Sequence, residues 1–445
     1  MLEKPTLSVI ILGQANSGKT TLAVQLLHSL GTINSSIMER VESGMQLDSS
    51  DSIRNYASVL SRTKDEIKRG RTMNLVYSMA ETKHFHLNII DAPANPFLKS
   101  MFRGISQANI GIVVLDAEIG AFEAGIPNIT TMIRATYCLG SIQLIFCVNK
   151  MESVDYSKTR FMEIKSEITK IYKNNGYKNG NATVIPISAL SSLLGNHNDD
   201  NILEPACGSK MEWYKGGRPC LLDAINSLKA PLYRYDLPLR ISISKVFNLK
   251  GALVVFGKIE TGILKLETEI RLTPHKKQFP PSMKIESIAI CRKLVREAKA
   301  GQLVTIQLKT SLNPSNVKPG MVLSDFNNDY AKEVHSFKAD IAVLRESPFR
   351  RGYNPTFNIH SLQTSCKFKD FYVSSNTIKR YERDENPMEL RKGQYATVLL
   401  KPKNQIYVAT VYSYPPFGRF LMWDNGNICV FGVITEVYTD SPPRR

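Results

Sequence analysis

The stretch VIILGQANSGKTTLAVQLL (Val9–Leu27) joins an apolar run, a glycine-bearing turn and an amphipathic segment. It contains the pattern G-x-x-x-x-G-K-T, whose fixed residues are Gly13, Gly18, Lys19 and Thr20. In a strand–loop–helix setting, the backbone N–H groups of such a loop surround phosphates. The lysine reaches the outer phosphates and the threonine hydroxyl ligates Mg²⁺. The stretch therefore predicts a phosphate-binding loop near the start of an α/β domain.

The chain around this loop alternates short β-rich runs with helical stretches up to about residue 190. The runs after the loop are FHLNIID, IGIVVLDA, IQLIFCVN and TVIPISA, and the clearest helical stretches are TTLAVQLLHSL and YSKTRFMEIKSEITKIYKNN. This alternation predicts a mostly parallel sheet with helices on both faces. Farther on, short strands separated by Gly, Pro and Asn predict two β-barrels. The expected domains are 1–233 for the α/β part, then 234–330 and 331–445 for the barrels.

Composition and charge narrow the class of protein. The 445 residues are 43% hydrophobic and 22% charged, and their apolar runs are too short to cross a bilayer. We therefore expect a protein without a membrane segment. Because a strand begins so close to Met1, leaving no room for a targeting peptide, we also expect it in the cytoplasm. The net charge of +17 favours polyanionic partners, above all RNA, although a basic surface can also serve solubility alone.

Three later motifs have the order and spacing of a guanine-nucleotide site. Asp91 ends the apolar run LNII, where a carboxylate lies beside Mg²⁺. The motif CVNKMES ends one buried strand, and VIPISAL contains the end of another. These motifs and the loop predict binding of GTP or GDP with Mg²⁺, with Asp91 acting on the metal through a water. The predicted nucleotide-binding residues are Gly13, Asn16, Ser17, Gly18, Lys19, Thr20, Thr21, Asp91, Asn149, Lys150, Glu152, Ser188, Ala189 and Leu190.

Longer phrases along almost the whole chain resemble the translational GTPases of the elongation factor 1-alpha class. They are SQANIGIVVLDAEIGAFEAGI, LGSIQLIFCVNKMES, MEWYKGG, GKIETGILK, SCKF and YPPFGRF, and they occur in the family's order. The resemblance implies a GTPase domain followed by two β-barrels, with bound GTP or GDP and Mg²⁺. It further implies delivery of tRNA, or of a protein shaped like tRNA, to the ribosomal A site. We also expect a monomer that works with the ribosome and a guanine-nucleotide exchange factor.

The chain departs from this family around the nucleotide. Thr72 matches the family threonine that binds Mg²⁺ in the first switch. In DAPANPFLKSM (Asp91–Met101), however, Ala94 and Asn95 replace a Gly–His pair and one residue is missing. In the family this histidine positions the attacking water, so Asn95 at this catalytic position predicts weak or absent hydrolysis of GTP. Glu152 replaces an aspartate that accepts two hydrogen bonds from guanine, and its extra methylene predicts weaker selectivity for that base.

Three functions fit these observations. The first is GTP-dependent delivery of aminoacyl-tRNA to the ribosomal A site, with impaired hydrolysis. The second is a release-factor or ribosome-rescue GTPase that carries a tRNA-shaped protein. The third is a paralogue that binds nucleotide or RNA without hydrolysis, and the residues that favour it are Asn16, Ala94, Asn95 and Glu152. The lack of a long extension before the phosphate loop favours the elongation-factor type.

Overall fold

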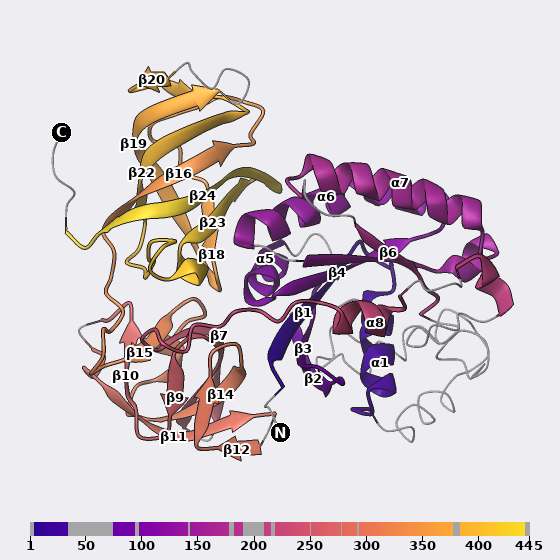
Figure 1. Cartoon of the computed structure of the whole chain (residues 1–445). Helices are drawn as coiled ribbons and strands as arrows, with labels where there is room; N and C mark the ends of the chain where they lie inside the picture. Colours follow the sequence, from indigo (N-terminus) through magenta and orange to yellow (C-terminus); the bar gives the residue numbers. More distant parts are fainter. Residues whose placement is uncertain are drawn as a thin grey trace. The chain divides into compact units, whose positions relative to one another are not determined.

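The computed structural model describes residues 4–33, 74–93, 98–140, 143–177, 182–189, 209–214, 219–249, 251–276, 278–291, 293–376 and 383–440 (Figure 1). The chain divides into two compact units. The first unit comprises Met1–Tyr137 and Ser141–Pro231, and the second comprises Cys138–Gly140 and Leu232–Arg445. Across the described ranges, every helix falls short of the length and apolarity that a bilayer crossing requires.

The first unit is built on a six-stranded sheet with the strand order β2-β3-β1-β4-β5-β6. Its strands are β1 (Thr6–Gly13), β2 (Val76–Glu81), β3 (His86–Asp91), β4 (Ile110–Asp116), β5 (Gln143–Asn149) and β6 (Thr183–Pro186). The edge strand β2 runs antiparallel to β3, whereas the other neighbours pair in parallel. The predicted, mostly parallel sheet is confirmed. The strand β2 was not predicted from the sequence, because an edge strand with intermediate burial lacks a long apolar run.

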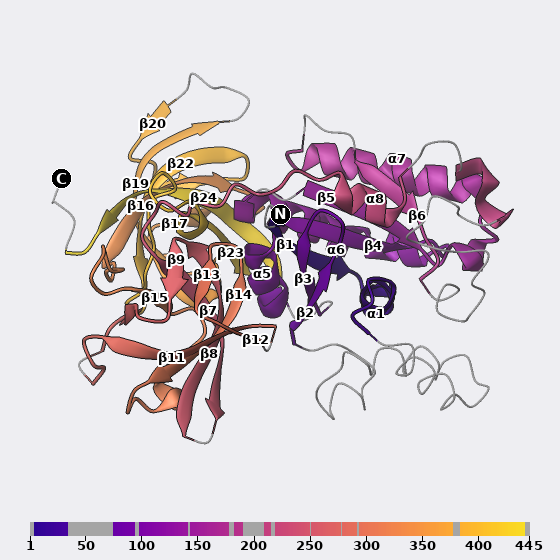
Figure 2. The same cartoon turned by 60° about the horizontal axis from the view of Figure 1, so that its bottom comes forward.

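Helices cover this sheet, and Figures 1 and 2 show α1 and α7 on opposite faces of it. The α-helices are α1 (Lys19–Ser29), α5 (Leu98–Gln107), α6 (Ala121–Gly140), α7 (Lys158–Asn174) and α8 (Leu221–Asn226). Two short 3-10 helices are η1 (Met151–Val154) and η2 (Ser209–Tyr214). The inner positions of β1, β4 and β5 are almost completely buried, as expected of strands covered on both faces. The predicted α/β layering is thus confirmed.

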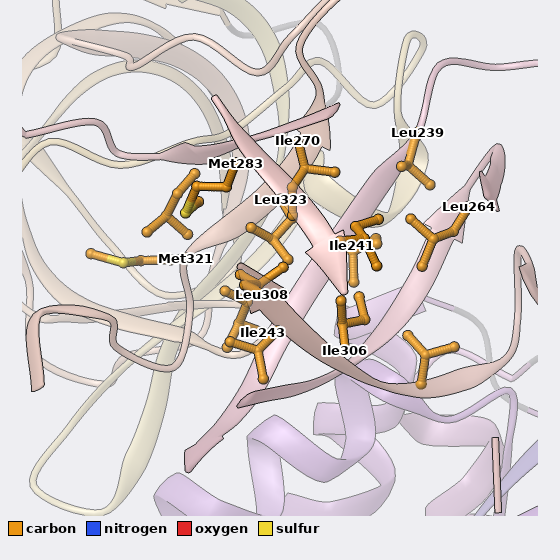
Figure 3. Packing of buried hydrophobic residues seen from close by; sticks show 14 of the residues in the cluster. Leu239, Ile241, Ile243, Leu264, Ile270, Met283, Ile306, Leu308, Met321 and Leu323 are labelled. Atoms are coloured by element: carbon orange, nitrogen blue, oxygen red, sulfur yellow. The ribbon is translucent and has the colours of Figure 1, made fainter. Parts of the chain in front are cut away.

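Two antiparallel β-barrels follow in the second unit. In the first, the ring β10-β15-β7-β8-β14-β11 is closed by the β10–β11 pairing, and β12 is appended to β11. Its strands are β7 (Arg240–Leu249), β8 (Ala252–Thr261), β9 (Ile263–Lys265), β10 (Glu269–Thr273), β11 (Met283–Ile290), β12 (Lys293–Val295), β13 (Glu297–Lys299), β14 (Leu303–Lys309) and β15 (Val322–Asp325), with η3 at Pro314–Asn316. Figure 3 shows aliphatic side chains from several of these strands meeting in the interior.

The second barrel repeats this plan. The ring β18-β23-β24-β16-β22-β19 is closed by the β18–β19 pairing, and β20 is appended to β19. Its strands are β16 (Ser336–Val343), β17 (Phe349–Arg350), β18 (Thr356–Ile359), β19 (Leu362–Asn376), β20 (Arg383–Glu385), β21 (Glu389–Leu390), β22 (Gln394–Pro402), β23 (Arg419–Asp424) and β24 (Asn427–Tyr438), with η4 at Pro415–Phe417. The two barrels confirm the predicted fold class. The expected domain limits at 233 and 330 stay predictions.

Within the second unit, the two barrels share a polar contact centred on Arg240, whose side chain is 2% exposed. The guanidinium donates to the Tyr407 hydroxyl at 3.0 Å, to the Asp329 carboxylate at 2.9 Å and to the carbonyl of Leu239 at 3.0 Å. It also lies 4.6 Å from the centre of the Tyr414 ring, and the Tyr414 hydroxyl donates to the same carboxylate at 2.8 Å. A buried cation whose hydrogen bonds are met in this way links the start of β7 to loops of the second barrel.

We expect Arg240→Ala to lower the free energy of unfolding by about 2–4 kcal/mol, because it removes several charge-assisted hydrogen bonds and leaves a cavity. Arg234→Ala is the matched control, since Arg234 pairs with Asp236 at the surface with 55% of its side chain exposed. Loss of that exposed pair should change the free energy of unfolding far less, because solvent screens it. Urea unfolding of both variants measures the difference, and equal losses would contradict the assigned role of Arg240.

Candidate nucleotide-binding site

The carboxyl ends of parallel strands bring most of the predicted nucleotide-binding residues to one edge of the sheet. Gly13, Asp91 and Asn149 are the last residues of β1, β3 and β5. Ser188 and Ala189 come shortly after the end of β6 and are buried. Because the carboxyl ends of parallel strands lie together, residues far apart in the sequence meet there. This is the edge at which open α/β sheets bind their ligands.

The backbone of the phosphate loop needs glycine at two positions. Gly13 has a φ of 153°, and a Cβ there would lie 2.5 Å from the carbonyl oxygen of Val114. Gly18 precedes α1 with a φ of 89°, and a Cβ there would lie 2.2 Å from Nδ2 of Asn149. Between them, Asn16 adopts a φ of 63°, a left-handed conformation that asparagine tolerates better than most residues. The loop is therefore shaped by close backbone approach on both sides.

Lys19 is a buried cation that lies over this loop. Its Nζ donates to the carbonyl oxygen of Gln14 at 2.6 Å, and the hydroxyl of Ser17 donates to the same oxygen at 3.1 Å. Burial lowers the pKa of Lys19 from 10.5 to about 8, and the nearby Asp91 carboxylate opposes that shift. A desolvated ammonium beside a loop of backbone donors is suited to a polyphosphate, whose charge would favour the protonated lysine.

Thr20 and Asp91 connect the first turn of α1 to the end of β3. The Thr20 hydroxyl donates to Oδ2 of Asp91 at 2.9 Å, and Asp91 is 2% exposed. A hydroxyl and a carboxylate in contact supply the hard oxygen ligands that Mg²⁺ prefers, directly or through water. The donor set therefore fits the predicted metal. Thr72, the other predicted ligand, lies outside the described residues.

Asn149 joins the phosphate loop to the side of the site that is predicted to bind the base. Its Nδ2 donates to the carbonyl oxygen of Ser17 at 2.8 Å, and its Oδ1 accepts from the N–H of Ala189 at 2.9 Å. The next residue, Lys150, has a φ of 63° and forms an ion pair of 2.6 Å with Asp116, which ends β4. Asp116 was not predicted from the sequence. It could have been, because an acidic residue at the end of an apolar strand indicates a position at this edge of the sheet.

Glu152 supplies an acceptor at the position predicted to read the base. It lies in η1, just after β5, and its Oε2 is buried. Among the described residues, no hydrogen-bond donor reaches this oxygen. A buried carboxylate oxygen without a donor is costly to leave in place, and the N1–H and amine of guanine are donors of the required kind. Asn95 and Leu190, like Thr72, lie outside the described residues, so their roles stay predictions.

Comparison with known proteins agrees with this arrangement. The model for the "Elongation factor Tu GTP binding domain" matches residues 4–230, and the "GTP-eEF1A C-terminal domain-like" model matches residues 336–435. Elongation factor 1-alpha of Plasmodium falciparum is 31% identical over 446 residues, which cover 98% of this chain and 96% of that protein. Elongation factor 1-alpha of Tetrahymena pyriformis is 31% identical over 443 residues, with 98% of each chain covered.

Solved structures agree in fold. The S. cerevisiae Ski7 GTPase-like domain bound to GTP superposes with a TM-score of 0.77 at 17% identity, covering 97% of this chain and 98% of that chain. The elongation factor SelB of Methanococcus maripaludis, in complex with a GTP analogue, gives a TM-score of 0.66 at 15% identity and covers 98% and 80%. At such identities the likeness concerns the fold alone.

The buried charge of Lys19 predicts opposite effects of Lys19→Met on stability and on binding. The pKa of Lys19 is about 8 in the folded protein, against 10.5 for an ordinary lysine. Below pH 8 the buried charge therefore lowers the free energy of unfolding of the nucleotide-free protein by roughly 3 kcal/mol. That cost fades as the pH rises from 8 to 10.5, where the unfolded lysine also loses its proton. We therefore expect the variant to be more stable than the empty natural protein at pH 7, by a margin that shrinks above pH 8, and to bind nucleotide far more weakly.

Urea unfolding at pH 7 and pH 9.5 measures the stability difference, and titration calorimetry with GDP measures binding. A variant that is less stable at pH 7 would contradict the cost assigned to the buried charge. Undiminished GDP binding would remove Lys19 from the phosphate site.

Proposed function

The chain belongs to the elongation factor 1-alpha class of translational GTPases, and we propose that it binds GTP and GDP and delivers aminoacyl-tRNA to the ribosomal A site. The observation that carries this proposal is the meeting, at one sheet edge, of the phosphate loop, the Thr20–Asp91 contact and the Asn149–Glu152 segment. The relatives cover nearly the whole chain, barrels included, which supports a role of the complete architecture.

In the proposed complex, the backbone N–H groups of the loop bind the phosphates and Lys19 neutralises the outermost charges. Thr20, Asp91 and Thr72 would hold Mg²⁺, Asp91 through a water, and the metal would neutralise charge on the outer phosphates. The base would donate its N1–H and amine to Glu152. The burial of Lys19 and of the Glu152 oxygen supports both ends of this arrangement.

Hydrolysis is the step that we propose is weakened. The protein accelerates phosphoryl transfer mainly by positioning the water and stabilising charge, since it contributes little covalent chemistry. Asn95 offers a short amide where the family has an imidazole, and Ala94 stiffens the loop where the family has glycine. Binding rests on other residues, namely Lys19, Thr20 and Asp91. The nucleotide-bound state can therefore persist although turnover is slow.

The distribution of charge favours RNA as cargo. Residues 232–445 carry 33 Lys and Arg against 19 Asp and Glu, whereas residues 1–231 carry 24 against 21. Almost all of the net positive charge thus belongs to the half of the chain that forms the barrels. Phosphate backbones bind such surfaces by releasing counterions. We propose tRNA and the ribosome as partners of a cytoplasmic monomer, with a guanine-nucleotide exchange factor completing the cycle.

Binding of tRNA should be strongly salt-dependent. We expect the affinity of the full chain for aminoacyl-tRNA to fall about a hundredfold or more between roughly 50 and 200 mM salt, because several phosphate contacts release counterions together. Filter binding or fluorescence anisotropy measures the salt slope, and GDP affinity over the same range is the control for intact protein. No binding of tRNA to the triphosphate-loaded protein at low salt would refute the proposed cargo and favour a protein cargo.

Hydrolysis should be restored by returning the family pattern. We expect a variant with Ala94→Gly, Asn95→His and one residue inserted after them to hydrolyse bound GTP about a hundredfold faster than the natural chain on ribosomes. Ala94→Gly alone is the control for loop flexibility without an imidazole. Single-turnover assays with and without ribosomes measure both. If the natural chain already matches the restored one, another group positions the water.

A further inference from the structure

Residues 116–123, which we call the bridging loop, comprise the last residue of β4, the connection 117–120 and the start of α6, and they contact the end of the site predicted to bind phosphate. The carbonyl oxygen of Ala121 accepts from Nε2 of Gln14 at 2.9 Å. Gln14 is the loop residue whose own carbonyl accepts from Lys19. Gly125, in the first turns of α6, lies so close that a Cβ there would be 1.6 Å from Oε1 of Gln14. The bridging loop thus lies directly against the phosphate loop.

The same loop contacts the base end. Asp116, which is 3% exposed, pairs with the Lys150 ammonium at 2.6 Å. The N–H of Ala117 donates to the backbone carbonyl of Asn149 at 2.9 Å. One short segment therefore touches Gln14 on one side and the Asn149–Lys150 pair on the other. A shift of this segment would change the distance between the residues predicted to bind phosphate and those predicted to bind the base.

Arg160, on α7, forms hydrogen bonds with both the backbone and a side chain of the bridging loop. Its side chain is 12% exposed. Nε donates to the carbonyl oxygen of Ala117 at 3.0 Å, and Nη2 donates to that of Glu118 at 3.3 Å. Nη1 donates to the Glu123 carboxylate at 2.9 Å, a contact that lowers the pKa of Glu123. The guanidinium also lies 5.9 Å from the centre of the Phe122 ring. One planar cation thus fixes both backbone carbonyls and the far end of the loop.

The middle of the bridging loop is exposed, although the N–H of Gly120 donates to the Glu123 carboxylate at 2.7 Å. Ile119 is 78% exposed and Gly120 has a φ of 85°, so the tip lies in solvent and contains a residue of high conformational freedom. Arg160 therefore restrains a loop whose outer side faces water. Side chains that support binding residues in this way set how precisely those residues are held.

We propose that Arg160 is a positioning residue for guanine-nucleotide recognition, which acts through the bridging loop on Gln14 and on the Asn149–Lys150 pair without touching the nucleotide. The inference rests on the proposed nucleotide binding, and it assigns to α7 a part in setting base selectivity. Without the guanidinium, the base end can move relative to the phosphate end. Guanine, which would donate its 2-amino group to Glu152, should then lose part of its higher affinity relative to hypoxanthine, which lacks that group.

A purely structural Arg160 would only hold α7 against the sheet. Arg134 offers a matched control for that role, because it is also an arginine that connects the same two helices. It lies on α6 and its Nε donates at 3.0 Å to Oδ1 of Asn175, the C-cap residue that follows α7. Its contact is distant in sequence from the bridging loop. We therefore expect Arg134→Ala to weaken the packing of α6 against α7 without changing nucleotide recognition.

The experiment compares Arg160→Ala, Arg160→Lys and Arg134→Ala with the natural full chain. Dissociation constants for GDP and for inosine diphosphate come from titration calorimetry, and thermal unfolding gives stability. We expect Arg160→Ala to weaken GDP binding about tenfold and to reduce the preference for GDP over inosine diphosphate about threefold. Arg160→Lys should lie between, because an ammonium can reach Glu123 but cannot span both carbonyls. Arg134→Ala should leave both quantities unchanged.

The outcomes separate the inference from the proposal beneath it. A natural chain that binds neither nucleotide overturns the proposed function, and the inference with it. A natural chain that binds GDP, together with an Arg160→Ala variant of unchanged affinity and unchanged preference, overturns the inference alone. So does an equal loss in Arg134→Ala. If Arg160→Ala does not fold, Arg160→Lys and Glu123→Gln carry the same test, and an unchanged base preference in both overturns the inference.

Discussion

The side-chain amide of Asn149 is the contact on which the site depends. It donates to the Ser17 carbonyl and accepts from the Ala189 N–H, so one buried group holds together three segments that are separate in the sequence. The tight approach of Gly18 to its Nδ2 leaves no room for a side chain. Both polar ends of the amide are satisfied inside the protein, which fixes its orientation. The phosphate loop and the residues predicted to bind the base are therefore held at a fixed spacing by the protein itself.

The same spacing bears on our proposal that nucleotide binding is retained in this chain while hydrolysis is weakened. The described residues that we predict to hold phosphates and metal end strands or begin α1, and of these Lys19 and Asp91 are buried. The substitutions that predict slow hydrolysis, Ala94 and Asn95, instead follow β3 in a segment outside the described residues. A rigid edge can retain the ground-state complex even where the group that orients water has been lost. We therefore expect the chain to retain nucleotide binding while hydrolysis is slow.

Much of this architecture could be predicted from the sequence, and the misses have physical reasons. The strands β1, β3, β4 and β5 are nearly all buried, so each is visible as an apolar run, which ends at glycine in β1 and at a polar residue in the other three. The edge strand β2 escaped detection because it is only partly buried. The partners of Asp116 and Arg160 could not be predicted either. A periodic pattern places a side chain on one face of a helix or strand, but it does not indicate which loop that face contacts. The roles of Thr72, Asn95 and Leu190 rest on the family resemblance alone.

The closure of each barrel determines how many backbone groups are left unpaired at the edges of its sheet. A ring that pairs β10 with β11, or β18 with β19, uses the backbone N–H and C=O groups of its own strands inside the ring. The strands appended to the rings, β12 and β20, are three residues long, which gives an incoming extended chain few groups with which to pair. Sheet edges are the usual places where unfolded polypeptides add to folded ones. The two closed rings therefore offer an incoming extended chain few unpaired backbone groups, which limits the ways in which such a chain could extend them.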